Sequence, residues 1–123
     1  MEEVVHLPVM GDIVMYVLTD DDANQVMRRR TQAHVIAAKI EDDKWPKGAQ
    51  AHLGNPARAG QILPMIIVAV WPDEGGPGRH GVNGKVFLDG TDVLWVTSRY
   101  QSDSKRPPGT WHHRTELPRS IVA

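Results

Sequence analysis

An apolar run followed by a turn between two shorter runs limits the fold of this chain more than any other feature of its sequence. Residues 65–71 read MIIVAVW, a mostly β-branched segment with no polar residue. Such a run is typical of a β-strand covered on both faces, because no alternation of polar and apolar residues is then needed. Residues 86–96 hold two further apolar runs around the turn signal DGTD at 89–92, and a glycine next to aspartates suits a tight reversal. We therefore predict a three-strand unit that includes a β-hairpin.

One helix is predicted between a strand at residues 13–18 and a proline-containing loop. Thr19 and Asp22 have the spacing of a capping box, and the first turn is acidic, which suits the positive end of the helix dipole. Apolar residues then recur at intervals of three and four as far as about Glu41. The predicted fold class is α+β, a small, mainly antiparallel β-sheet with one long α-helix packed on it.

Length and charge limit the domain count and the class of partner. A chain of 123 residues fits one domain, residues 1–123, with a core over about 11–112 and a tail at 113–123. The formal net charge of −1 argues against DNA or RNA as a partner, because those partners require broad neutralisation of phosphates. No apolar run is long enough to cross a bilayer, and the acidic N-terminus does not resemble a signal peptide. We expect no membrane association and a cytoplasmic location.

Motifs for catalysis, metal binding or cofactor binding are not present in the sequence. The chain has no cysteine, and its histidines show neither HExxH nor HxH spacing. A GxSxG elbow, a P-loop and a GxGxxG motif are also missing. We therefore predict a protein that is not an enzyme and that needs no metal and no cofactor. Any nucleotide would be held by side chains rather than by a glycine-rich loop at a helix N-terminus.

Two tryptophans and a group of arginines are candidates for contact with a ligand. Trp71 ends the first predicted strand beside a glycine-rich loop, where its ring could lie against a flat ligand. Trp95 lies inside a strand and is predicted to be core. The run of arginines at 28–30 alone indicates a solvated helix face, but guanidinium groups also bind phosphate bidentately and stack on rings. Arg99, at the end of the hairpin, could approach the same surface.

Two further groups of polar residues carry alternative interpretations. Asn83 precedes a glycine, which favours a turn, although its amide could also read the edge of a base as donor and acceptor. The loop AHLGN and its continuation hold His52, Asn55 and Arg58, a possible second anion site. After a proline-rich stretch, residues 110–112 could pack back onto the sheet.

Five motifs of the chain resemble a family of small phage and prophage proteins. They are GDIVMYVLTDDDANQVMRRRT, WPKGAQAHLGN, PMIIVAVW, VNGKVFLDGTDVLWVTSR and PGTWH. The likeness covers about residues 11–112, and its most specific part is VNGxVFLDGxDxxWVTS. That family is similar to the first anti-Thoeris family of phage proteins, which bind cyclic ADP-ribose-type signals, and in some members cyclic dinucleotides, without cleaving them.

The resemblance implies a nucleotide sponge that silences a bacterial immune pathway from within the host cytoplasm. It also implies a homodimer or a higher homo-oligomer. Carried over residue by residue, the ligand-binding positions are Arg28, Arg29, Arg30, Trp71, Asn83 and Arg99. The alternative is a phage accessory protein, an inhibitor or a morphogenesis factor, that acts by protein–protein binding. A small hydrolase or transferase is a third possibility.

Overall fold

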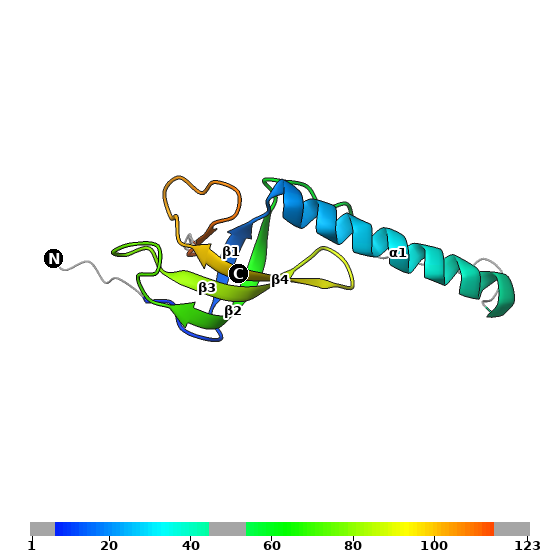
Figure 1. Ribbon diagram of the computed structural model, residues 1–123, viewed down its shortest axis with the longest axis horizontal. Helices are drawn as coiled ribbons and strands as arrows, with labels where there is room; N and C mark the ends of the chain where they lie inside the picture. Colours follow the sequence, from blue (N-terminus) through cyan, green and yellow to red (C-terminus); the bar gives the residue numbers. More distant parts are fainter. Residues whose placement is uncertain (1–6, 45–53, 115–123) are drawn as a thin grey trace, which may run out of the picture.

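The computed structural model describes the backbone of residues 7–44 and 54–114, and the side chains of all of these except residues 34–44 (Figure 1). One helix and five strands follow one another along the chain. Their bounds are β1 (Ile13–Val17), α1 (Asp20–Lys44), β2 (Ile62–Trp71), β3 (Gly81–Phe87), β4 (Val93–Tyr100) and β5 (Trp111–His112). The predicted α+β class is confirmed, whereas most of the predicted tail, residues 115–123, lies outside the described residues.

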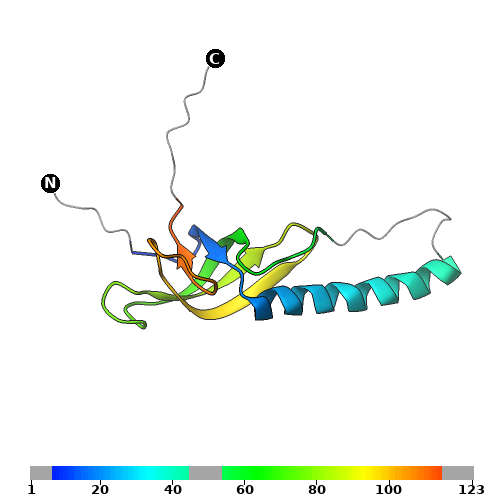
Figure 2. The same ribbon diagram turned by 90° about the horizontal axis from the view of Figure 1, so that it is seen from above.

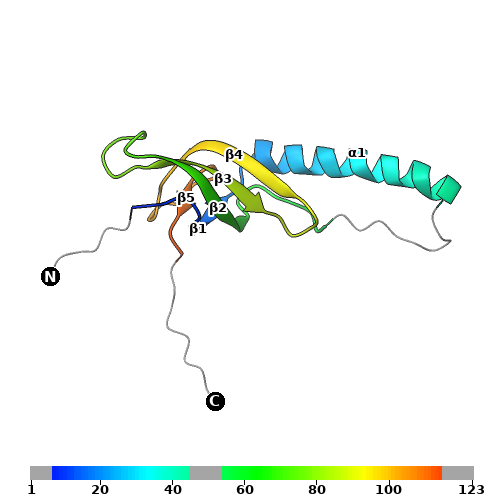
Figure 3. The ribbon, with the colours of Figure 1, turned by 90° about the horizontal axis from the view of Figure 1, so that it is seen from below.

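The five strands form one curled sheet in the order β4-β3-β2-β1-β5, and neighbouring strands run antiparallel. A parallel bridge between Gln101 and Trp111 brings the chain just after β4 close to β5. Views from above and from below show the curl, with α1 attached at one end (Figures 2 and 3). The predicted hairpin is confirmed as β3 and β4, which are joined by residues 88–92.

The inner side of the curled sheet holds the hydrophobic core. Its members come from every strand and from the first turns of α1, and they are Val14, Tyr16, Leu18, Val26, Met65, Ile67, Val82, Val86, Leu88, Leu94, Val96 and Trp111. Trp111 is fully buried, and its Nε1 donates a 3.1 Å hydrogen bond to the carbonyl oxygen of His80. The prediction that residues 110–112 pack back onto the sheet is therefore confirmed.

Helix α1 begins at the predicted capping box. The backbone N–H of Asp22 donates to Oγ1 of Thr19 at 3.0 Å, and the backbone N–H of Thr19 donates to Oδ2 of Asp22 at 3.1 Å. Two N–H groups at the helix start are thereby satisfied by side chains.

Only the first turns of α1 pack against the sheet. Ala23 and Val26 are buried there, and the helix then runs past the β3–β4 hairpin (Figures 1 and 2). The predicted length of the helix is not confirmed, because the part with described side chains covers 14 residues, from Asp20 to Ala33. In residues 7–44 and 54–114, no helix has the length and apolar character that crossing a bilayer requires.

Two predictions of burial are wrong. Strand β2 is not covered on both faces, since Val68 and Trp71 are exposed, the latter to 43%. Trp95, predicted to be core, is 61% exposed. The physical reason is the same for both: the core lies on the inner side of the sheet, and no second layer of the described chain covers the outer side at these positions of β2 and β4.

The prediction of a turn at Asn83-Gly84 is also wrong. Both residues lie inside strand β3. Gly84 is required for a close approach rather than for a reversal, because a Cβ atom there would lie 2.4 Å from Sδ of Met65 on the neighbouring strand.

Candidate functional site

The outer side of the sheet presents an exposed indole beside a side-chain amide. Trp71 ends β2, and its Nε1 donates a 3.4 Å hydrogen bond to Oδ1 of Asn83 on β3. The same oxygen accepts a 2.8 Å hydrogen bond from the backbone N–H of Ser98 on β4. One amide oxygen therefore connects three neighbouring strands.

Two β-bulges place these groups. The pairing of β2 with β3 shifts by one residue between Ile67 and Ala69, and the pairing of β3 with β4 shifts at the same level, around Asn83. Ser98 has a φ of 49°, a left-handed value that costs a non-glycine residue on the order of 1 kcal/mol. Because a bulged residue leaves the regular ladder, its N–H needs another acceptor, and the oxygen of Asn83 supplies one.

The orientation of the Asn83 amide follows from these contacts. Trp71 and Ser98 both contribute N–H donors, so the oxygen of the amide has to face them. Within the described part of the chain, the Nδ2 group donates no hydrogen bond. The side chain of Asn83 can therefore donate a hydrogen bond to a ligand, but its oxygen is already occupied. The sequence analysis had expected the amide to act as both donor and acceptor.

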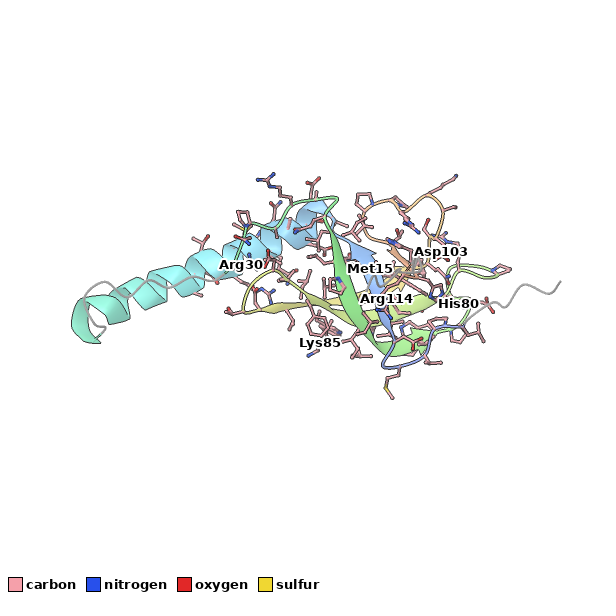
Figure 4. All side chains as sticks on the ribbon, turned by 180° about the vertical axis from the view of Figure 1, so that it is seen from behind. Met15, Arg30, His80, Lys85, Asp103 and Arg114 are labelled. Atoms are coloured by element: carbon pink, nitrogen blue, oxygen red, sulfur yellow. The ribbon has the colours of Figure 1, made fainter. Side chains whose placement is uncertain are left out.

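Further aromatic and cationic side chains share this side of the sheet, which we call the outer face. Lys85 and Phe87 follow Asn83 at intervals of two along β3, so their side chains point to the same side. Lys85 pairs with Trp95, and Phe87 pairs with Val93, across β4. Figure 4 shows Lys85 pointing away from the core. The residues that define the outer face are Trp71, Asn83, Lys85, Phe87, Val93 and Trp95.

Arg99 lies on the inner side of the sheet. It pairs with Val82, which is fully buried, and its Nη2 is 3.4 Å from Oδ1 of Asp22. Its guanidinium carbon lies 5.8 Å from the ring centre of Tyr16. Tyr16 donates a 2.5 Å hydrogen bond to Oδ2 of Asp22, and burial together with this bond raises the pKa of the Tyr16 hydroxyl. The structure does not bring Arg99 to the side that carries Trp71.

We expect Arg99→Ala to lower the free energy of unfolding by about 1–2 kcal/mol, because the buried carboxylate of Asp22 loses its cationic partner. Urea denaturation measures this change. Arg99→Met keeps the apolar stem and should be almost as destabilising, since the lost contact is ionic. A stability equal to that of the unmodified protein in both variants would contradict this assignment.

The three helix arginines point in different directions. Arg28 is exposed and makes no hydrogen bond or ion pair to any described residue, and Nη2 of Arg29 donates a 3.2 Å hydrogen bond to the carbonyl oxygen of Val93. Arg30 is only 7% exposed. Consecutive helical residues point about 100° apart, so one surface cannot collect all three guanidinium groups.

The guanidinium of Arg30 is occupied within the chain. Its Nε and Nη2 bind the two carboxylate oxygens of Asp92 at 3.0 and 2.8 Å, and its Nη1 donates to the carbonyl oxygen of Asn55. The hydrogen bonds from Arg30 lower the pKa of Asp92. Arg30 therefore joins α1 to the tip of the β3–β4 hairpin and to the loop before β2.

The predicted second site is only partly described, because His52 lies outside the described residues. A hollow of about 580 Å³ is lined by Asn55, Pro56, Arg58, Ala59, Gly60 and Gln61. Nδ2 of Asn55 donates to Oδ2 of Asp89 at 2.7 Å, and the backbone N–H of Arg58 donates to Gln61. The side chain of Arg58 is the cationic group on the wall of this hollow.

No cluster of metal ligands occurs in the described parts of the chain: nowhere do three or more histidine, aspartate or glutamate side chains lie close enough to hold an ion. The sequence analysis did not predict the hydrogen bond from Ser98 to Asn83 or the contribution of Lys85 and Phe87 to the outer face. The alternation Asn83, Lys85, Phe87 has the period of a strand and could have revealed it, but the dipeptide Asn83-Gly84 indicated a turn instead.

The chain was compared with protein-family models, with curated proteins and with solved structures, and none of them matches it. The resemblance to phage proteins therefore remains an expectation from sequence motifs, and the function is argued from the site itself.

Proposed function

We propose that the protein is a non-enzymatic binder that sequesters a nucleotide signal, of the cyclic ADP-ribose or cyclic dinucleotide type, inside the bacterial cytoplasm. The observation that carries this proposal is the exposed indole of Trp71 beside an amide whose orientation is fixed. An indole face stacks on a nucleobase, and such stacking contributes about 1–3 kcal/mol. The Nδ2 group of Asn83 would donate to a carbonyl oxygen or ring nitrogen at the edge of that base.

A cation for the phosphates is available on the same face. Lys85 lies two residues beyond Asn83 on β3, which is about 7 Å along the strand. A nucleotide whose base lies on Trp71 would reach Lys85 with its phosphate group. Arg28 and Arg29 extend from α1, and Arg29 donates to the carbonyl oxygen of Val93 at the other end of the sheet from Trp71, so neither takes part in this proposal. Arg30 and Arg99 take structural roles in this proposal.

Sequestration makes different demands on a site than catalysis does. A sponge needs slow release of an unchanged ligand, whereas an enzyme needs groups that stabilise a transition state better than the substrate. A preorganised amide and an indole provide binding energy without a nucleophile or a general base.

Isothermal titration calorimetry against cyclic ADP-ribose isomers and cyclic dinucleotides tests this proposal. We expect at least one of these to bind, and the bound compound to be recovered chemically intact after the protein is denatured by heat. Trp71→Ala should weaken binding by about tenfold or more, because the stacking contact is lost. A complete absence of heat with every compound, or recovery of a cleaved product, would end the proposal.

A second candidate function is protein–protein binding by a phage accessory protein. The exposed aromatic side chains Trp95 and Phe87 favour it, because exposed apolar patches mark contact sites for proteins. A chain that binds no nucleotide yet captures a defined bacterial protein through these residues would support this alternative.

A further inference from the structure

The indole of Trp71 has an aromatic counterpart two strands away. Trp71, Gly81 and Tyr100 are successive register partners on β2, β3 and β4, and directly opposed residues project to the same side of a sheet. That side is the outer one, because Gly81 precedes Asn83 by two residues on β3. Since Gly81 has no side chain, the space above it is available to another group.

A carboxylate takes that space. The chain turns tightly after β2, where the backbone N–H of Glu74 donates to the carbonyl oxygen of Trp71 at 3.3 Å. This turn brings the side chain of Glu74 back over the sheet, so that a Cβ atom on Gly81 would lie 3.2 Å from Oε2 of Glu74. A larger residue at position 81 would therefore displace the carboxylate.

Only one oxygen of the Glu74 carboxylate is engaged. The hydroxyl of Tyr100 donates to Oε1 at 3.4 Å, whereas no group of the described chain donates to Oε2. The guanidinium carbon of Arg79 lies 5.4 Å from the centre of the Tyr100 ring, but among the described residues Arg79 forms no ion pair with Glu74. The carboxylate is therefore available to a ligand beside Trp71.

Together with Asn83, this carboxylate offers a defined hydrogen-bond pattern. Nδ2 of Asn83 can only donate, because Oδ1 is bound by Trp71 and Ser98, and the carboxylate can only accept. Positions 81 and 83 are about 7 Å apart on the same side of β3, so both groups can reach one base that lies on Trp71. The matching base has one acceptor beside donors on a single edge.

Guanine is the one standard base whose Watson–Crick edge has an acceptor followed by two donors. Its O6 accepts a hydrogen bond, and its N1–H and N2–H2 groups donate side by side. One carboxylate can accept from both donors in a charge-assisted bidentate pair. Adenine has a single donor and a single acceptor on the corresponding edge, so it would make one hydrogen bond fewer.

We infer that Glu74 and Asn83 select a guanine base at the Trp71 site. The carboxylate of Glu74 accepts from N1–H and N2–H2, and Nδ2 of Asn83 donates to O6. Lys85 lies on the other side of Asn83 along β3, so the negative end of this row receives the base and the positive end receives the phosphate. The inference rests on the proposed function and narrows the ligand to a guanine-containing cyclic nucleotide.

Isothermal titration calorimetry on the full chain with three cyclic dinucleotides tests this inference. We expect cyclic di-GMP to bind about tenfold or more tightly than cyclic di-AMP, because the bidentate contact is lost with adenine. Cyclic di-IMP should fall between them, since hypoxanthine keeps O6 and N1–H but lacks the N2 amine. This comparison needs no variant of the protein.

Glu74→Gln is the variant that isolates the carboxylate. Glutamine has nearly the same size but cannot accept two hydrogen bonds with a full negative charge. The affinity for cyclic di-GMP should therefore fall by about tenfold, while that for cyclic di-AMP stays the same or rises. Asp21→Asn removes the same charge from an exposed position on α1 and should leave the ratio of the two affinities unchanged. Circular dichroism and thermal unfolding establish that both variants are folded.

The possible outcomes separate this inference from the proposed function. Equal or tighter binding of cyclic di-AMP by the unmodified chain would overturn the guanine preference and leave nucleotide sequestration intact. So would an unchanged affinity ratio in folded Glu74→Gln. Absence of binding with all three cyclic dinucleotides would overturn the inference, and binding of a cyclic ADP-ribose isomer alone would then preserve the proposed function without it.

Discussion

Arg30→Ala is expected to lower the free energy of unfolding by about 3 kcal/mol, the largest stability change that we predict for one helix arginine. Truncation leaves the half-buried carboxylate of Asp92 without its bidentate partner and removes a donor from the carbonyl oxygen of Asn55. The first turns of α1, the hairpin tip and the loop before β2 would then no longer share a contact. Chemical denaturation followed by circular dichroism measures the change.

Arg28→Ala is the matched control for this experiment. The two residues are on the same helix and lose the same atoms, but Arg28 is exposed and bonded to no described residue, so its removal should change stability by no more than about 0.5 kcal/mol. Equal effects in the two variants would show that the contact with Asp92 contributes nothing measurable.

The pH dependence of the Arg30 effect has a definite sign. The folded-state pKa of Asp92 lies below its ordinary value of 3.8 because Arg30 donates hydrogen bonds to the carboxylate. A depressed carboxyl pKa contributes stability above the unfolded pKa, and this contribution is lost as the pH falls through the folded pKa. The stability difference between the unmodified protein and Arg30→Ala should therefore be full above about pH 4 and shrink at lower pH.

Local features of the sequence predicted the elements that local interactions decide. The DGTD turn, the capping box of Thr19 and Asp22, and the α+β class could be predicted because they depend on residues within a few positions of one another. The separate roles of the three helix arginines could not be predicted. Arg30 is buried because a hairpin tip 62 positions away in the sequence comes to lie beside it, and the helical pattern contains no information about that neighbour.

The wrong prediction for Trp95 has a similar cause. Trp95 and Trp111 both follow apolar or turn-rich segments, yet Trp111 is fully buried and Trp95 is exposed. The strand register decides the difference, since Trp111 pairs with the buried Tyr16 on β1 whereas Trp95 pairs with the exposed Lys85 on β3. Strand periodicity can assign residues to two faces, but it cannot tell which face a single chain will cover.

The contact between Trp71 and Asn83 could not be predicted from the sequence. Both residues were candidate ligand-binding residues, but the sequence favoured a turn at Asn83 and did not predict the bulge at Ser98. A bulge depends on how two strands pair, so the sequence of one strand alone cannot predict where it occurs. The resulting contact changes the chemistry that can be expected of Asn83, from a donor and acceptor to a donor only.

Asn83→Asp should abolish nucleotide binding while leaving the fold intact, and this is the sharpest functional effect that we predict. Aspartate has nearly the same shape as asparagine, and its carboxylate still accepts the hydrogen bonds from Ser98 and Trp71. It can no longer donate to a base, and its charge repels phosphate. We expect the affinity for cyclic ADP-ribose isomers and cyclic dinucleotides to fall by about 100-fold or more, roughly 3 kcal/mol, with no loss of thermal stability.

Asn83→Ala is the comparison that separates the role of the side-chain oxygen from that of the Nδ2 group. Alanine removes the acceptor as well as the donor, so the N–H of Ser98 would be left without a partner in a left-handed conformation, and stability should fall by about 1–2 kcal/mol. Both Asn83→Asp and Asn83→Ala should lose nucleotide binding, because each removes the Nδ2 group that contacts the ligand. Only Asn83→Ala should also lose stability, because it removes the oxygen that maintains the bulge. Retained affinity in Asn83→Asp would mean that the amide has only a structural role, and the ligand would then have to be sought elsewhere on the outer face.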